Sequence, residues 1–96
     1  MKATLVLRRR EVLPGGLTVE MVIWQLPAPT AERPHGLNYR LQAHRGGRMV
    51  VRYDNETGKG DHRHYGRREQ RYRFVNMERL IEDFITDVER LGGGHG

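Results

Sequence analysis

The sequence predicts an α+β domain, in which an antiparallel sheet of four to five strands is covered on one face by a single C-terminal helix. Segments in which apolar and polar residues alternate follow one another along most of the 96-residue chain. Glycine-rich turns, including Gly15-Gly16 and Gly46-Gly47, are short enough to join antiparallel hairpins. One segment near the C-terminus has helical periodicity. Because it is the only predicted element that is not a strand, we expect this helix to cover the sheet.

Five segments are strand candidates because apolar or aromatic side chains alternate with polar ones. Residues 37–44 alternate without interruption, whereas 17–26 carry apolar residues on both faces near their end. Three prolines between residues 27 and 34 predict a loop. In chain order, the strand candidates are residues 3–8, 17–26, 37–44, 49–53 and 71–74.

Residues 76–91 are the helix candidate. Asn76 can cap the first turn, and acidic residues lie opposite an apolar stripe. The stripe consists of Met77, Leu80, Ile81, Phe84, Ile85, Val88 and Leu91. Gly92 ends the helix, so we expect one domain over residues 1–91 and a flexible glycine-rich tail over 92–96.

The amino-acid composition excludes several classes of protein. Only 36% of the residues are apolar, which predicts a thin core, and there are no cysteines. Disulfides and thiolate zinc sites are therefore excluded. The apolar run after Met1 is too short for a signal peptide, and no segment has the length of a membrane span. We expect a cytoplasmic protein.

The formal net charge of +5 is unevenly distributed. From Lys59 to Arg73, six cations stand against two acids. Such a basic segment is typical of a protein that binds the phosphates of nucleic acid. The predicted nucleic-acid-binding residues are Arg63, Arg67, Arg68, Arg71 and Arg73.

The segment from residue 54 to 64 carries the candidate catalytic groups. It is predicted to be a turn, and a turn needs only a glycine and an Asn or Asp to reverse the chain. This one also contains a dense set of titratable side chains: Asp54, Lys59, Asp61, His62 and His64. Imidazoles change charge near neutral pH, so His62 and His64 could share the general base and general acid roles.

These groups are suited to cleaving RNA without a metal or another cofactor. The reaction needs a base for the 2′-hydroxyl, an acid for the leaving oxygen and cations for the developing charge. Asp54 or Asp61 could orient an imidazole, Lys59 could supply charge, and Tyr53 or Tyr65 could act as a further acid or a stacking surface.

Other interpretations of this segment stay open. The two histidines could belong to a solvated loop, or the segment could grip nucleic acid or another target without catalysis. A metal site built from the same Asp and His side chains is a third alternative, although nearby arginines would repel a dication. Outside the segment, Trp24 is interpreted as a core or partner-facing residue, and His35 as a surface residue.

Several segments resemble the TumE family of toxin–antitoxin toxins. They are Glu20 to Pro27, Arg52-Tyr53-Asp54-Asn55, Gly58-Lys59-Gly60-Asp61-His62-Arg63-His64, Tyr72-x-Phe74, and Leu80, Phe84 and Asp87 of the acidic helix. The resemblance covers nearly the whole chain, and Asp-Asn…Gly-Lys-Gly-Asp-His-x-His is its most specific part. The family motif falls on Tyr53, Asp54, Asn55, Lys59, Gly60, Asp61, His62 and His64.

The resemblance implies a toxin of a type II system, encoded beside a helix-turn-helix antitoxin that neutralises it. It also suggests an RNA-directed activity of the kind seen in RelE-like toxins. The expected partners are therefore this antitoxin and RNA, and a homodimer is left open.

Overall fold

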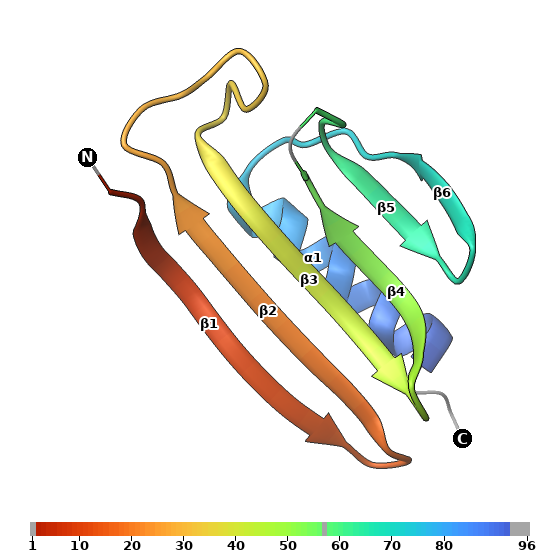
Figure 1. Ribbon diagram of the computed structural model, residues 1–96. Helices are drawn as coiled ribbons and strands as arrows, with labels where there is room; N and C mark the ends of the chain where they lie inside the picture. The colour runs from red at the N-terminus through yellow and green to blue at the C-terminus, as the bar shows by residue number, and fades with distance from the viewer. Residues whose placement is uncertain (1, 57, 93–96) are drawn as a thin grey trace.

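The computed structural model describes residues 2–56 and 58–92. In this part of the chain, six strands are followed by one α-helix and a π-helical turn (Figure 1). The strands are β1 (Thr4–Leu13), β2 (Leu17–Gln25), β3 (Leu37–Arg45), β4 (Arg48–Asp54), β5 (His62–Tyr65) and β6 (Arg68–Arg71), the helix is α1 (Met77–Asp87), and the π-helical turn η1 is Val88–Gly92.

The strands form one sheet in chain order, and each pairs antiparallel with its neighbours. Figure 1 shows α1 behind β3 and β4, on one face of the sheet. The predicted architecture of an antiparallel sheet covered on one face by a C-terminal helix is confirmed. The strand count is wrong, because the described residues form six strands and not four to five.

The difference in strand count comes from the histidine-rich segment, which was predicted to be a turn. Residues 62–65 instead pair with β4 and form a hairpin with β6, and Gly66 supplies the positive φ of 60° at the bend. The side chains of β6 are all exposed and those of β5 only half-buried. These strands therefore lack the apolar alternation that identified the others. The last strand begins at Arg68 and ends at Arg71, so the boundaries predicted as 71–74 are wrong as well.

The first strand is also longer than predicted. It reaches Leu13 and pairs with β2 along its length, with one irregularity between Leu5 and Leu7. Its second half contains charged residues because it lies at the sheet edge, where side chains are exposed. The alternation of apolar and polar residues that identifies a half-buried strand therefore ends at residue 8, and the strand was predicted to end there.

The helix packs on the sheet as the periodicity predicts. The side chain of Asn76 accepts a hydrogen bond from the Arg79 amide at 2.7 Å, which confirms the N-cap. Leu80, Phe84 and Val88 are buried against the sheet. Ile85 is 40% exposed, so its predicted packing is wrong, because the apolar stripe is wider than the surface that the sheet covers. The sheet contributes Leu17, Val19, Met21, Ile23, Leu41, Val51 and Tyr53 to this core.

The opposite face of the sheet, which we call the open face, carries no covering element from the described residues (Figure 1). Polar side chains of β3 and β4, such as Arg40, Gln42 and Arg52, alternate with the buried ones and point to this face. No helix in the described part of the chain is long and apolar enough to cross a membrane. Apart from Gly92, the predicted tail over 92–96 lies outside the described residues.

Candidate active site

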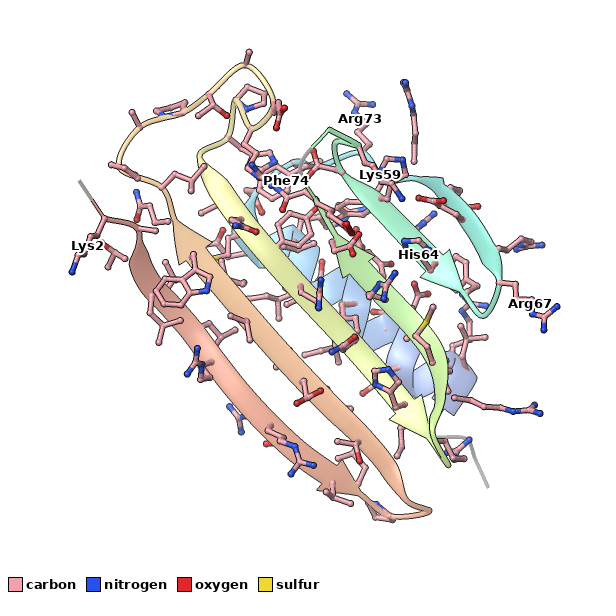
Figure 2. The ribbon with its side chains drawn as sticks, in the orientation of Figure 1. Lys2, Lys59, His64, Arg67, Arg73 and Phe74 are labelled. Carbon is pink, nitrogen blue, oxygen red and sulfur yellow. The ribbon has the colours of Figure 1, made fainter. Side chains whose placement is uncertain are left out.

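The sheet register brings the two histidines together with residues from both neighbouring strands. His62 lies opposite Asp54 of β4, and His64 lies opposite Arg52 of β4 and Glu69 of β6. Residues that oppose one another in an antiparallel pair share a face, and here it is the open face (Figure 2). We call this set the histidine cluster: Arg52, Asp54, His62, His64 and Glu69.

The two imidazoles converge on one carboxylate. Nε2 of His62 and Nε2 of His64 each lie 3.8 Å from Oε2 of Glu69. The same nitrogen of His64 is 3.8 Å from Oδ1 of Asp54. At this separation the groups form no direct hydrogen bond. The cluster therefore holds two imidazoles next to two carboxylates, with no direct hydrogen bond between them.

Local contacts fix one of the rings. Nδ1 of His62 lies 3.0 Å from the Gly60 carbonyl oxygen, which can only accept, so Nδ1 carries a proton and donates it. In the neutral ring, Nε2 is then the basic nitrogen, and it points at Glu69. Asp54 is anchored in turn, because Nε of Arg52 lies 3.3 Å from its Oδ2.

Sequence reasoning missed Glu69. The signal for it was present in the short Gly66-Arg67 bend, because a two-residue loop places Tyr65 opposite Arg68 and therefore His64 opposite Glu69. That register can be used only once residues 62–65 are recognised as a strand.

Asp61 lies outside the histidine cluster. Its Oδ1 accepts a hydrogen bond from the Tyr39 hydroxyl at 2.6 Å and lies 3.0 Å from Nε2 of His35. Nδ1 of His35 accepts from the Leu37 amide, so Nε2 carries the proton and donates to Asp61. Burial and the bond to Asp61 raise the pKa of Tyr39 well above its ordinary value. His35 also packs on Phe74 at 3.9 Å between ring centroids, so its interpretation as a surface residue is wrong.

The neighbouring motif residues have different environments. The amide of Asn55 donates to the Leu37 carbonyl and its oxygen accepts from the Tyr39 amide, so it joins the loop after β4 to β3. Lys59 is exposed in the turn before β5. Figure 2 shows Lys59 at one end of β5 and Arg67 at the other end, in the turn to β6.

The five predicted nucleic-acid-binding arginines do not lie on one face. Arg71 opposes His62 on the open face, whereas Arg63 and Arg68 alternate with the histidine cluster and point to the helix side. Arg67 lies in the β5–β6 turn, and Arg73 follows β6. Strand alternation therefore divides a sequence segment that looked like one basic surface.

A second polar group, the tyrosine cluster, lies on the helix side: Tyr53, Arg63, Tyr65, Tyr72 and Asp87. Asp87 accepts hydrogen bonds from Tyr53 at 2.5 Å and from Tyr65 at 2.7 Å. The Arg63 guanidinium donates to the Tyr53 hydroxyl at 3.2 Å and lies within 6 Å of three tyrosine rings. Burial alone would raise the pKa of Asp87, but the hydrogen bonds from Tyr53, Tyr65 and Arg90 outweigh it and lower that pKa.

A groove of about 370 Å³ adjoins the histidine cluster on the open face. Asp54 belongs to both, because it lines the groove and lies 3.8 Å from His64. The groove is lined by Val22, Trp24, Arg33, Asn38, Tyr39, Arg40, Asp54 and Glu56. Trp24 is therefore part of the open face and not of the core.

Across residues 2–56 and 58–92, no set of three or more His, Asp or Glu side chains is arranged to hold a metal ion. The geometry of this part of the chain therefore lends no support to the metal interpretation.

Comparison with known proteins gives one family. No curated protein and no solved structure matches the chain. A family model described as Toxin TumE matches residues 2–91. This match spans almost the whole sequence, including both polar clusters and the groove, so the chain belongs to the TumE toxin family.

Proposed function

We propose that this toxin cleaves RNA by acid–base chemistry in the histidine cluster. The observation that carries the proposal is the approach of two imidazole Nε2 atoms, from His62 and His64, to the same Glu69 oxygen on an open sheet face. Two groups that exchange protons near neutral pH are the minimum for a general base and a general acid.

The proposed reaction is a transfer within the RNA strand. One imidazole takes the proton of the 2′-hydroxyl as its oxygen forms a bond to phosphorus. The bond from phosphorus to the 5′-oxygen breaks, and the second imidazole gives that oxygen a proton. The products are a 2′,3′-cyclic phosphate and a 5′-hydroxyl, and no water, metal or other cofactor takes part.

The remaining predicted residues support this reaction in different ways. Asp54 orients His64, and the Arg52 guanidinium that anchors Asp54 adds positive charge beside the phosphate. We assign Asp61 a positioning role, since its bonds to Tyr39 and His35 hold the loop that leads into β5. Lys59, exposed at the end of that loop, is proposed to contact a neighbouring phosphate.

Membership of a toxin family implies an antitoxin partner. We propose that this antitoxin is a helix-turn-helix protein and that toxin and antitoxin act in the cytoplasm. An antitoxin that covered the open face would block the histidine cluster and would compete with RNA. We also leave a homodimer of the toxin as a proposal, and we assign no surface of the protein to its interface.

A non-catalytic role is the second candidate function. It is favoured by the exposed arginines on both faces of the β5–β6 hairpin, which could grip nucleic acid or a target without any chemistry. In that case the histidine cluster would contribute charge and shape, and the toxin would inhibit its target by occupancy.

The test uses His62→Gln and His64→Gln, assayed separately on RNA in EDTA with identification of the product ends. Removing one positioned acid or base typically lowers a rate by about 10²–10⁴-fold, and we expect a loss of this size for each variant. His44→Gln is the matched control, since His44 lies on β3 and is outside the cluster. Full activity in the double variant His62→Gln/His64→Gln, folded as the parent by thermal melt, would overturn the proposal in favour of binding.

A further inference from the structure

The groove beside the histidine cluster has the chemistry of a base-binding site. We propose that it holds an unpaired RNA base, stacked on Trp24, next to the phosphate that is cleaved. This inference rests on the proposed function and adds a substrate subsite to it.

The first argument is the position of the indole ring. Trp24 lies on the open face, opposite Asn38 of β3, and lines the groove while remaining partly accessible. The Arg8 guanidinium lies 6.0 Å from the ring centroid and stacks over it. A large aromatic surface that lies outside the core and stays partly accessible is suited to stacking a base.

The second argument is the set of polar groups around the ring. Asn38 and Arg40 line the groove and can donate hydrogen bonds to the edge of a base, and the Glu56 carboxylate can accept one. This mixture of donors and acceptors around an aromatic surface matches a nucleobase better than it matches an apolar side chain.

The third argument is charge. The carboxylate of Asp54 is balanced by Arg52, whose Nε lies 3.3 Å away. Around the groove, Arg8, Arg33 and Arg40 outnumber the one further carboxylate, Glu56, and this net positive charge favours an anionic chain such as RNA.

The fourth argument is continuity with the proposed catalytic groups. Arg40 of β3 lies directly opposite Asp54 of β4, and Asp54 in turn lies 3.8 Å from His64. A base in the groove therefore belongs to a nucleotide whose backbone passes over Asp54 to the two imidazoles.

The test uses Trp24 as its own reporter, because it is the one tryptophan of the chain. The probe is a short 2′-O-methyl RNA oligonucleotide, which binds like RNA but lacks the 2′-hydroxyl that the proposed cleavage requires. Saturating oligonucleotide should quench the fluorescence of Trp24, because a base stacked on the ring contacts it directly. In parallel, the anisotropy of a labelled oligonucleotide measures affinity without depending on the indole.

Substitutions then test the subsite. Loss of one stacking surface weakens binding by roughly 5- to 150-fold, so we expect Trp24→Leu to lower the anisotropy affinity by that factor, whereas Trp24→Phe retains most of it. Arg8→Ala and Arg9→Ala form a matched pair on adjacent positions of β1. Arg8 stacks on Trp24, whereas Arg9 opposes the buried Met21 on the other face, so Arg8→Ala should weaken binding and Arg9→Ala should leave it unchanged.

The outcomes separate the subsite from the proposed catalysis. Quenching of the parent's Trp24 and loss of affinity in Trp24→Leu, with no RNA cleavage by the parent, would support the subsite and contradict the ribonuclease proposal. Cleavage and oligonucleotide binding by the parent without any change in Trp24 fluorescence would overturn the subsite alone. If Trp24→Leu does not fold, Arg40→Ala at the groove wall replaces it, and unchanged affinity in that variant counts against the subsite.

Discussion

Two polar clusters lie back to back on opposite faces of β4 and β5, and their geometry differs. In the tyrosine cluster, donors and acceptors meet at hydrogen-bond distance, as in the 2.5 Å and 2.7 Å contacts that Asp87 makes with Tyr53 and Tyr65. In the histidine cluster, each imidazole Nε2 stays 3.8 Å from the nearest carboxylate oxygen. Tyr53, Tyr72 and Asp87 of the first cluster are buried on the helix side, and the second cluster lies on the open face.

The difference indicates separate roles. Directly paired groups satisfy one another's hydrogen-bonding capacity and stabilise one arrangement. Groups that are not hydrogen-bonded to one another keep donors and acceptors for a ligand. The alternation of a β-strand lets His62-Arg63-His64 serve both sides at once, with Arg63 in the tyrosine cluster and the histidines opposite.

The largest expected effect on stability comes from the covered side. Phe84 is fully buried and packs edge-on against Tyr53 at 5.8 Å between ring centroids. We expect Phe84→Ala to lower the free energy of unfolding by about 3–5 kcal/mol, measured by urea denaturation. The control is Ile85→Ala on the adjacent, exposed position, which should cost only about 0.5 kcal/mol. Equal losses in the two variants would show that α1 does not pack on the sheet through Phe84.

The second prediction concerns Asp87 and its dependence on pH. Because the folded protein lowers the pKa of this carboxyl below its ordinary 3.8, the ionised form contributes stability above that value. This contribution is lost as the pH falls through the lower, folded pKa. Asp87→Asn should therefore reduce the unfolding free energy by about 1.5–3 kcal/mol at neutral pH. The difference from the parent should shrink at acidic pH.

The measurement for Asp87→Asn is urea unfolding at neutral pH and at several acidic pH values, with Glu89→Gln as the exposed control on η1. A gap between parent and variant that stays constant into strong acid would show that the ionised carboxylate is not what stabilises the tyrosine cluster. The proposed RNA cleavage should change little if the two clusters act independently.

The elements predicted correctly are those whose burial leaves a local pattern. The helix, its Asn76 cap and the strands around residues 17–26 and 37–44 all place apolar side chains at regular spacing, so the sequence alone indicates them. β5 and β6 were not predicted, because they are strands through backbone pairing alone and their side chains form no apolar face that the sequence could reveal.

The candidate site was predictable in part for a similar reason. His62, His64 and Asp54 are near one another in sequence, and the register joins them on one face. Glu69 required the hairpin register. The partners of Asp61 could not be predicted, because Tyr39 and His35 lie 22 and 26 residues away in the sequence and only the folded sheet brings them to it.

The smallest predicted effect tests which face of the β5–β6 hairpin contacts RNA in the proposed function. Arg71 and Arg68 are both exposed on β6 but oppose His62 and Tyr65, so they point to the open face and the helix side respectively. Each lost phosphate contact lowers the slope of log affinity against log salt by about one unit. We expect Arg71→Ala to flatten the slope for a labelled 2′-O-methyl RNA by about that amount and Arg68→Ala to leave it unchanged. Equal flattening in both variants would mean that RNA wraps the hairpin. A larger effect of Arg68→Ala would place RNA on the helix side, next to the tyrosine cluster, and would remove the histidine cluster from its path.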